Sequence, residues 1–264
     1  MLSFRDVHEK CGENKNGDNS SCCDHTFLGK TFANKSVHKT YTHFSRNFAW
    51  KLIRGDSIKR LAVFASGFGS NLAHIHREIM EGRLLGAELA LVLSNNSTSG
   101  ALEYAKKHGL AFRHLSVASS GSAEQFEKSL MDEMDANNIE IVALAGYLKK
   151  LPDSFVERFE YKIVNVHPAL LPSFGGSAMY GIRVHEAVLA RGCKVSGASV
   201  HFVTREYDAG PIILQKCCPV KEEDTPEALQ RRVRDIEFEI FPNALGLLAQ
   251  DKLIVKNNRV HILP

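Results

Sequence analysis

Several patterns that would fix the class of this protein at once are missing from its 264 residues. No apolar run approaches the roughly 20 residues of a transmembrane helix, so we expect no membrane role. The net charge is only +3 and acids and bases are interleaved, which argues against nucleic acid as a partner. No HExxH, complete GxxxxGKS/T or GxSxG sequence indicates a zinc protease, a nucleotide P-loop or a serine hydrolase.

Cysteine is scarce too. Six cysteines in a chain of this length do not make a disulfide scaffold. Cys22–Cys23 and Cys217–Cys218 are adjacent pairs, whose Cα atoms lie ~3.8 Å apart, below the usual separation across a disulfide. No CxxC pair indicates zinc or thioredoxin-like chemistry. We interpret the cysteines as reduced and the protein as intracellular, and we predict no metal.

The composition of the sequence changes at about residue 58. Residues 1–58 mix polar residues with scattered aromatics and show no sustained period, which predicts a disordered leader. Residues 25–55 contain six basic residues and no acid, as transit peptides do, but five acids precede them. A cytoplasmic protein and one sent to a plastid or mitochondrion by this leader both remain open. So does a leader that is an artefact of gene prediction or cloning.

From Lys59 onward, strands and helices alternate. We predict strands near 60–66, 87–94, 139–145, 162–167, 198–203 and 211–215, and helices near 72–83, 100–108, 123–137, 184–191 and 226–250, with a closing hairpin over 253–262. This alternation implies βαβ crossovers. The fold prediction is therefore one α/β, Rossmann-like domain over 59–264, with a mostly parallel sheet flanked by helices.

The strand near 162–167 carries the best candidate site. Its period of two puts Asn165 and His167 on one side, and Pro168 blocks further sheet pairing. An amide and an imidazole are thus delivered together at a carboxyl end, where open α/β sheets bind ligands. The alternative is a hydrogen-bonded structural histidine.

A glycine loop, Gly67-Phe68-Gly69-Ser70-Asn71, separates the first strand from its helix. Glycines there let backbone N–H groups approach an anion, and the helix dipole helps to bind it. The third glycine of GxGxxG is absent, so we expect a monophosphate rather than a dinucleotide. The alternative is a tight turn in which Ser70 caps the helix.

Three further segments are candidates. The segment from Gly146 to Leu151 follows a buried strand and can line a ligand slot, but spacing alone favours a plain strand-to-helix connection with solvated lysines. Asp208 lies in a Gly/Pro-bounded loop, and a carboxylate beside His167 would orient the ring and raise its pKa. Arg234 and Glu237 share a helix face, which usually indicates a solvated ion pair.

Taken in order, five segments resemble the phosphoribosylglycinamide formyltransferases, the folate-dependent enzymes of purine synthesis. The matching stretches are 63–71, 145–149, 165–172, 199–203 and 207–211. The resemblance implies formyl transfer from 10-formyltetrahydrofolate, as co-substrate, to the amine of glycinamide ribonucleotide (GAR). It implies small-molecule partners, a monomer or homodimer, and no metal.

The resemblance also assigns residues to roles. Asn165, His167 and Asp208 match the catalytic trio. The other matches are Gly67, Gly69, Ser70, Asn71 and Glu237 on the substrate-phosphate side, and Tyr147, Leu148, Lys149, Leu151 and Asn165 on the folate side. Two departures concern ligand binding: Ser177-Ala178 stands where Lys-Gly is expected, and an arginine of some relatives is absent near 122–124. Each departure removes a cation, and the loss of a cation would weaken the binding of an anionic ligand.

Three other functions compete with this one. Formyltetrahydrofolate deformylase shares the Asn-x-His…Asp set but normally carries an N-terminal regulatory domain, for which the leader lacks periodic strands. Methionyl-tRNA formyltransferase would need a C-terminal tRNA-binding domain, for which we find no remaining segment. A non-catalytic folate- or nucleotide-binding relative is a third class, which the intact trio disfavours.

Overall fold

A computed structural model describes residues 58–264. The predicted leader lies outside the described residues except for residue 58, and the division into leader and domain stays a prediction. The strands are β1 Lys59–Phe64, β2 Ala87–Ser94, β3 Phe112–His114, β4 Ile141–Leu144, β5 Ile163–His167, β6 Val195–Phe202, β7 Ile212–Pro219, β8 Leu253–Lys256 and β9 Arg259–Ile262. The helices are α2 Ser70–Met80, α3 Gly100–Lys107, α4 Val117–Ser120, α5 Ala123–Ala136, α6 Asp153–Arg158, α7 Ile182–Ala190 and α8 Pro226–Ala249.

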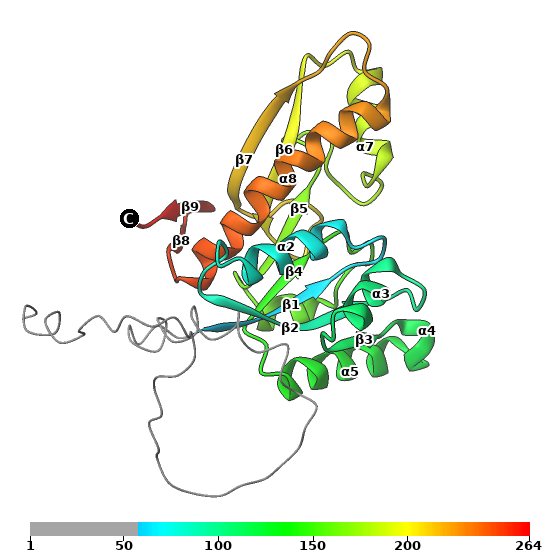
Figure 1. Cartoon of the computed structure of the whole chain (residues 1–264), viewed down its shortest axis with the longest axis vertical. Helices are drawn as coiled ribbons and strands as arrows, with labels where there is room; N and C mark the ends of the chain where they lie inside the picture. Colours follow the sequence, from blue (N-terminus) through cyan, green and yellow to red (C-terminus); the bar gives the residue numbers. More distant parts are fainter. Residues whose placement is uncertain (1–57) are drawn as a thin grey trace, which may run out of the picture. The chain divides into compact units, whose positions relative to one another are not determined.

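A seven-stranded sheet in the order β3-β2-β1-β4-β5-β6-β7 forms the centre (Figure 1). Strands β1 to β5 are parallel, while β6 and β7 run antiparallel at one edge. The predicted mostly parallel α/β sheet is therefore confirmed. The closing hairpin also forms, as β8 and β9. Strand β3 and helices α4 and α6 were not predicted, because three to six residues are too few to show a period.

The alternation of side chains along β1 builds two separate cores. Leu61 and Val63 point to the face covered by α2, α3, α7 and α8, whereas Ala62 and Phe64 point to the face covered by α5 and α6. All four are fully buried. Figure 1 shows α2 and α8 together across the first face. A strand buried on both faces reads as a continuous apolar run, which is how the sequence presents β1.

The sheet has a switch point between β1 and β4. The chain moves outward from β1 to β2 and β3, then returns to place β4 on the other side of β1. The two loops that follow β1 and β4 are consequently neighbours. The backbone N–H of Ser66 donates to the carbonyl of Gly146 (3.0 Å), and the N–H of Leu148 donates to Ser66 Oγ (2.9 Å). Open α/β sheets bind ligands at such a point.

Helix α8 brings further side chains to this edge. Thr225 caps its N-terminus by accepting a hydrogen bond from the N–H of Ala228, and Pro226 occupies the first turn, where a missing N–H costs nothing. Its apolar side packs on β6, β7 and α2. Three of its polar residues, Gln230, Arg234 and Glu237, lie with the loops that follow β1 and β4. Neither α8 nor any other helix within residues 58–264 is long and apolar enough to cross a membrane.

Candidate active site

A cavity of about 440 Å³ opens at the carboxyl ends of β1, β4 and β5. Its wall includes the three residues predicted to be catalytic, Asn165, His167 and Asp208. Asn165 and His167 come from β5, and Asp208 comes from the loop between β6 and β7. The antiparallel pairing of β6 with β5 places His201 opposite Asn165. The loop after Phe202 then carries Asp208 to His167 and His201.

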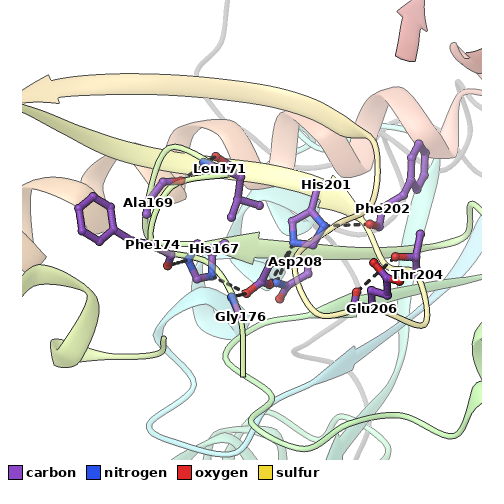
Figure 2. Close-up of polar contacts among 12 residues, drawn as sticks. His167, Ala169, Leu171, Phe174, Gly176, His201, Phe202, Thr204, Glu206 and Asp208 are labelled. Atoms are coloured by element: carbon purple, nitrogen blue, oxygen red, sulfur yellow. Dashed lines mark hydrogen bonds and ion pairs between the residues drawn. The ribbon is translucent and has the colours of Figure 1, made fainter. Parts of the chain in front are cut away.

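Asp208 lies between two imidazoles (Figure 2). Its Oδ2 is 3.5 Å from His167 Nδ1, and its Oδ1 is 3.6 Å from His201 Nε2. Oδ2 also accepts the backbone N–H of Gly176 at 2.8 Å. Asp208 has φ 54°, a left-handed conformation that Asp and Asn tolerate better than most residues. The carboxylate can therefore orient both rings and exchange protons with His167.

Both nitrogens of His167 face acceptors. Its Nε2 lies 2.8 Å from the carbonyl oxygen of Phe174, which can only accept, so Nε2 carries a proton. Its Nδ1 faces Asp208. The imidazolium form satisfies both neighbours, and a hydrogen bond from His167 to a ligand requires one of these two contacts to be exchanged.

The amide of Asn165 is oriented by His201. His201 Nδ1 donates to the carbonyl of Phe202 (2.8 Å), so in the neutral ring Nε2 is an acceptor. Asn165 Nδ2 donates to that Nε2 at 3.1 Å. One N–H of the amide is thereby held in place and the second remains available to a ligand. A fixed N–H donor in a cavity is what stabilises a developing oxyanion.

Burial and neighbouring charges have opposite effects on the pKa values of His167 and Asp208. Burial lowers the pKa of His167, and the Asp208 carboxylate counteracts this. Burial would raise the pKa of Asp208, but the neighbouring imidazoles of His201 and His167 and the hydrogen bond from the N–H of Gly176 outweigh it and leave that pKa below its usual value. Asp208 is thus ionised at neutral pH, with a histidine beside it that can lose or gain a proton.

The glycine loop forms the second wall. Gly69 precedes α2 in a left-handed conformation (φ 79°), and a Cβ there would lie 2.9 Å from the Cα of Ala101. Ser70 is the first residue of α2 and makes no capping hydrogen bond, so the alternative in which Ser70 caps the helix is wrong. Ser70 and Asn71 line the cavity, whereas Gly67 and Gly69 shape the loop without lining it.

Helix α8 adds a carboxyl group and a cation to this wall. Glu237 accepts a hydrogen bond from Asn71 Nδ2 at 2.9 Å, and burial raises its pKa to about 7. Arg234 also lines the cavity and makes no hydrogen bond or ion pair with another side chain in the part of the chain described. The expected solvated ion pair between Arg234 and Glu237 is therefore wrong. Instead, a guanidinium faces the cavity beside Ser70 and Asn71.

The segment after β4 forms the third wall. All four of its predicted ligand-binding residues line the cavity: Tyr147, Leu148, Lys149 and Leu151. Tyr147 is buried edge-to-face against Phe64 (centroids 5.6 Å apart), and burial raises its pKa to about 12. Leu148 is half exposed, although its backbone is fixed by the bond to Ser66. The expected ligand slot is thus an apolar wall with a lysine at its rim.

The structure adds residues that the sequence did not single out. These are His185 on α7 and Gln230 on α8, which line the cavity. Arg234 was noted in the sequence, but only as one half of an ion pair, and it lines the cavity too. His201 belonged to a noted segment, and its place opposite Asn165 follows from the register of β5 and β6. His185 had no such signal. Within residues 58–264, no group of three or more His, Cys, Asp or Glu side chains is arranged to hold a metal ion.

The fold and this cavity are those expected of a formyl transferase, and comparison with known proteins agrees. The formyl transferase family model matches residues 59–245, and the chain belongs to this family. "Phosphoribosylglycinamide formyltransferase, chloroplastic" of Arabidopsis thaliana is 37% identical over 206 residues, which cover 78% of this chain and 70% of that protein.

Solved structures give the same picture. Glycinamide ribonucleotide transformylase 1 from Symbiobacterium toebii matches with a TM-score of 0.73 and 37% identity, covering 80% of this chain and 96% of that one. A formyltetrahydrofolate deformylase from Pseudomonas syringae matches with a TM-score of 0.70 and 27% identity. The match covers 78% of this chain and 66% of the deformylase chain. The resemblance read from the five sequence segments is therefore confirmed.

Proposed function

We propose that this protein transfers the formyl group of 10-formyltetrahydrofolate to the amine of glycinamide ribonucleotide, giving formyl-GAR in purine biosynthesis. One observation carries the proposal. One cavity holds the Asn165, His167 and Asp208 trio between the glycine loop and an apolar wall. Those two walls suit the two substrates, a phosphorylated ribonucleotide and a flat pterin.

The reaction follows from the arrangement of the trio. The amine attacks the formyl carbon, and the carbonyl oxygen becomes an oxyanion in the tetrahedral intermediate. The free N–H of Asn165 donates to that oxygen. A proton leaves the attacking nitrogen and reaches the departing N10 of the folate, and Asp208 with His167 accepts and returns it, directly or through a water molecule. The C–N10 bond then breaks.

The phosphate end uses a different set of groups. Backbone N–H groups at the start of α2 and the side chains of Ser70 and Asn71 supply hydrogen-bond donors. Arg234 supplies the positive charge, and an unpaired guanidinium matches a phosphate in a bidentate way. Glu237 fixes Asn71 and is placed to accept from a ribose hydroxyl.

The folate end relies on the segment from Tyr147 to Leu151. Its apolar members would pack against the pterin, and Lys149 at the rim would face the glutamate tail. Ser177 also lines the cavity, at the position where relatives are expected to carry a lysine. We propose that Lys149 takes over part of that electrostatic role.

The deformylase reaction is the second candidate, since a solved deformylase has the same fold. In that reaction the formyl group is transferred to water. No phosphorylated acceptor is involved, so Arg234 and the glycine loop would have no ligand to bind. The relatives named as glycinamide ribonucleotide enzymes are also more similar to this chain, at 37% against 27% identity. Transfer to the ribonucleotide is accordingly the better account.

The test follows tetrahydrofolate release from 10-formyltetrahydrofolate with and without glycinamide ribonucleotide. We expect release only when the ribonucleotide is present. Release at the same rate without it would establish the deformylase instead. Folate binding without any release would leave a non-catalytic binding protein.

The cellular location is proposed as cytoplasmic, with a plastid or mitochondrion as the alternative if residues 1–58 act as a transit peptide. The relative in Arabidopsis is named as chloroplastic, which is compatible with the alternative. A fluorescent protein fused behind residues 1–58 decides between them: diffuse fluorescence supports the first, and fluorescence confined to an organelle supports the second.

A further inference from the structure

A row of three polar residues runs from the trio to the edge of the sheet. His167 on β5 lies directly opposite Ser199 on β6, and Ser199 lies directly opposite Gln215 on β7. Residues opposite one another on paired strands have their side chains on the same face of the sheet. Ser199 is fully buried and Gln215 is exposed, and neither lines the cavity. Any effect of these two residues on the reaction must therefore pass through other parts of the protein.

The side chains of Ser199 and Gln215 bind the chain just after β5. Ser199 Oγ donates to the carbonyl of Ala169 (2.6 Å) and accepts the backbone N–H of Leu171 (2.9 Å). It also accepts from the amide nitrogen of Gln215 (2.8 Å), so the single donor and both acceptor positions of the hydroxyl are used. The same amide nitrogen donates to the carbonyl of Leu171 (2.8 Å). In the described part of the chain, no other hydrogen bond ties residues 169–176 to β6 or β7.

This segment, residues 169–176, returns to the trio at two points (Figure 2). The backbone carbonyl of Phe174 accepts a hydrogen bond from His167 Nε2 at 2.8 Å. The backbone N–H of Gly176 donates to Asp208 Oδ2, also at 2.8 Å. One short segment thus contacts both groups that move the proton in the proposed reaction.

Close packing links Leu171 to Asp208 within this segment. A Cβ on Gly175 would lie 2.8 Å from Leu171 Cδ2 and 3.2 Å from Asp208 Cβ, so both side chains lie against the Gly175 backbone. Leu171 is buried, and closely packed interiors transmit a displacement to their neighbours. A shift of Leu171 would consequently move Gly175 and, with it, the N–H of Gly176.

We propose that Ser199 and Gln215 are positioning residues for the reaction. They fix residues 169–176, and that segment holds the His167 ring and the Asp208 carboxylate in the geometry for proton transfer. The inference rests on the proposed function, in which those two groups accept and return the proton. A reacting group misplaced by about 1 Å through a distant substitution can cost about 100-fold in rate, so a contact outside the cavity can matter.

The test compares Gln215→Met, Ser199→Ala and Gln250→Met in the full chain. Methionine has nearly the length of glutamine but no amide with which to donate. Gln250 is the matched control, because it is also exposed and its Nε2 donates to a backbone carbonyl, that of Gly246, at 2.8 Å outside the cavity wall. The measurements are kcat and KM for both substrates, the exchange rate of the Gly176 amide by NMR, and Tm as the measure of folding.

We expect Gln215→Met to lower kcat by about tenfold, with KM for glycinamide ribonucleotide within about threefold. Exchange of the Gly176 amide should become about tenfold faster, as expected when the segment loses one hydrogen bond. Ser199→Ala should have at least these effects and a lower Tm, because it leaves buried backbone groups without a partner. Gln250→Met should equal wild type in kcat and in Gly176 exchange.

A folded Gln215→Met protein in which either kcat or Gly176 exchange equals that of wild type overturns the inference. An equal change of both quantities in Gln250→Met overturns it as well. If Ser199→Ala does not fold, the exposed Gln215 still decides the matter. Wild-type protein that forms no formyl-GAR overturns the proposed function instead, and the exchange rate, which needs no turnover, then still shows whether Gln215 holds the segment.

Discussion

Replacing Asp208 with asparagine tests the trio with little change in shape. Asparagine also tolerates the left-handed backbone that Asp208 adopts (φ 54°), and its oxygen can still accept the N–H of Gly176. What is lost is the charge that lies 3.5 Å from His167 Nδ1 and 3.6 Å from His201 Nε2. The substitution therefore removes proton exchange and ring orientation together.

The expected loss is at least ~100-fold in kcat, the usual effect of removing an acid–base partner. This corresponds to about 2.7 kcal/mol in the activation free energy. Because Asp208 is not among the groups assigned to the phosphate, KM for the ribonucleotide should stay within about threefold. Steady-state kinetics with both substrates measures these quantities, and thermal unfolding checks that the variant is folded.

Asp251→Asn is a matched control, because Asp251 has the same φ of 54° and makes only an exposed ion pair with Lys59 (3.8 Å). Like Asp208→Asn, this substitution removes a carboxylate from a residue in the left-handed conformation. Asp251 does not line the cavity, so the kcat of the control should equal that of wild type. If Asp208→Asn retained a kcat within threefold of wild type, or if the control lost as much, the assignment of the trio would be refuted.

Substitutions at Arg234, at the two loop glycines and at Glu237 test the phosphate side. Arg234→Gln should raise KM for glycinamide ribonucleotide by about tenfold or more, because the positive charge binds the phosphate. Arg234→Lys keeps the charge and should keep most of the affinity. Equal KM values in the two variants would contradict this. Gly69→Ala should lower both Tm and ribonucleotide affinity, since its Cβ would lie 2.9 Å from Ala101, whereas Gly67→Ala meets nothing within 4 Å and should be tolerated. Burial raises the pKa of Glu237 from 4.5 to about 7, so the folded state holds this proton more tightly and stability falls as pH rises from about 4.5 to 7, by up to about 3 kcal/mol. Glu237→Gln should remove that fall, and parallel pH profiles of Tm in wild type and variant would be the contrary result.

The sequence sufficed for the fold because the pattern is strong where the elements are long. The buried run of β1 and the amphipathic α8 leave no choice of element type, and their order implies the parallel sheet. The short elements β3, α4 and α6 escaped prediction because their formation depends on neighbours in space. The strand predicted over 211–215 is also longer than expected. It forms β7, which extends to Pro219 because it pairs with β6 along the whole length of β6.

The site was predictable in part for a similar reason. Asn165 and His167 alternate on one strand, so local geometry already places them together. Their meeting with Asp208 could be expected only from the family resemblance, since it depends on the path of the loop between β6 and β7. The unpaired state of Arg234 and the hydrogen bonds of Ser199 depend on what surrounds each side chain. Spacing along the chain carries no such information.

Formyl transfer to the ribonucleotide can be tested by following the formyl carbon itself. Wild-type protein is mixed with 10-formyltetrahydrofolate labelled with ¹³C in the formyl group, together with glycinamide ribonucleotide, and the products are resolved by NMR. We predict that the label moves to the ribonucleotide as an N-formyl group, in equal amount to the tetrahydrofolate released. Label recovered as free formate, with the ribonucleotide unchanged, would contradict it.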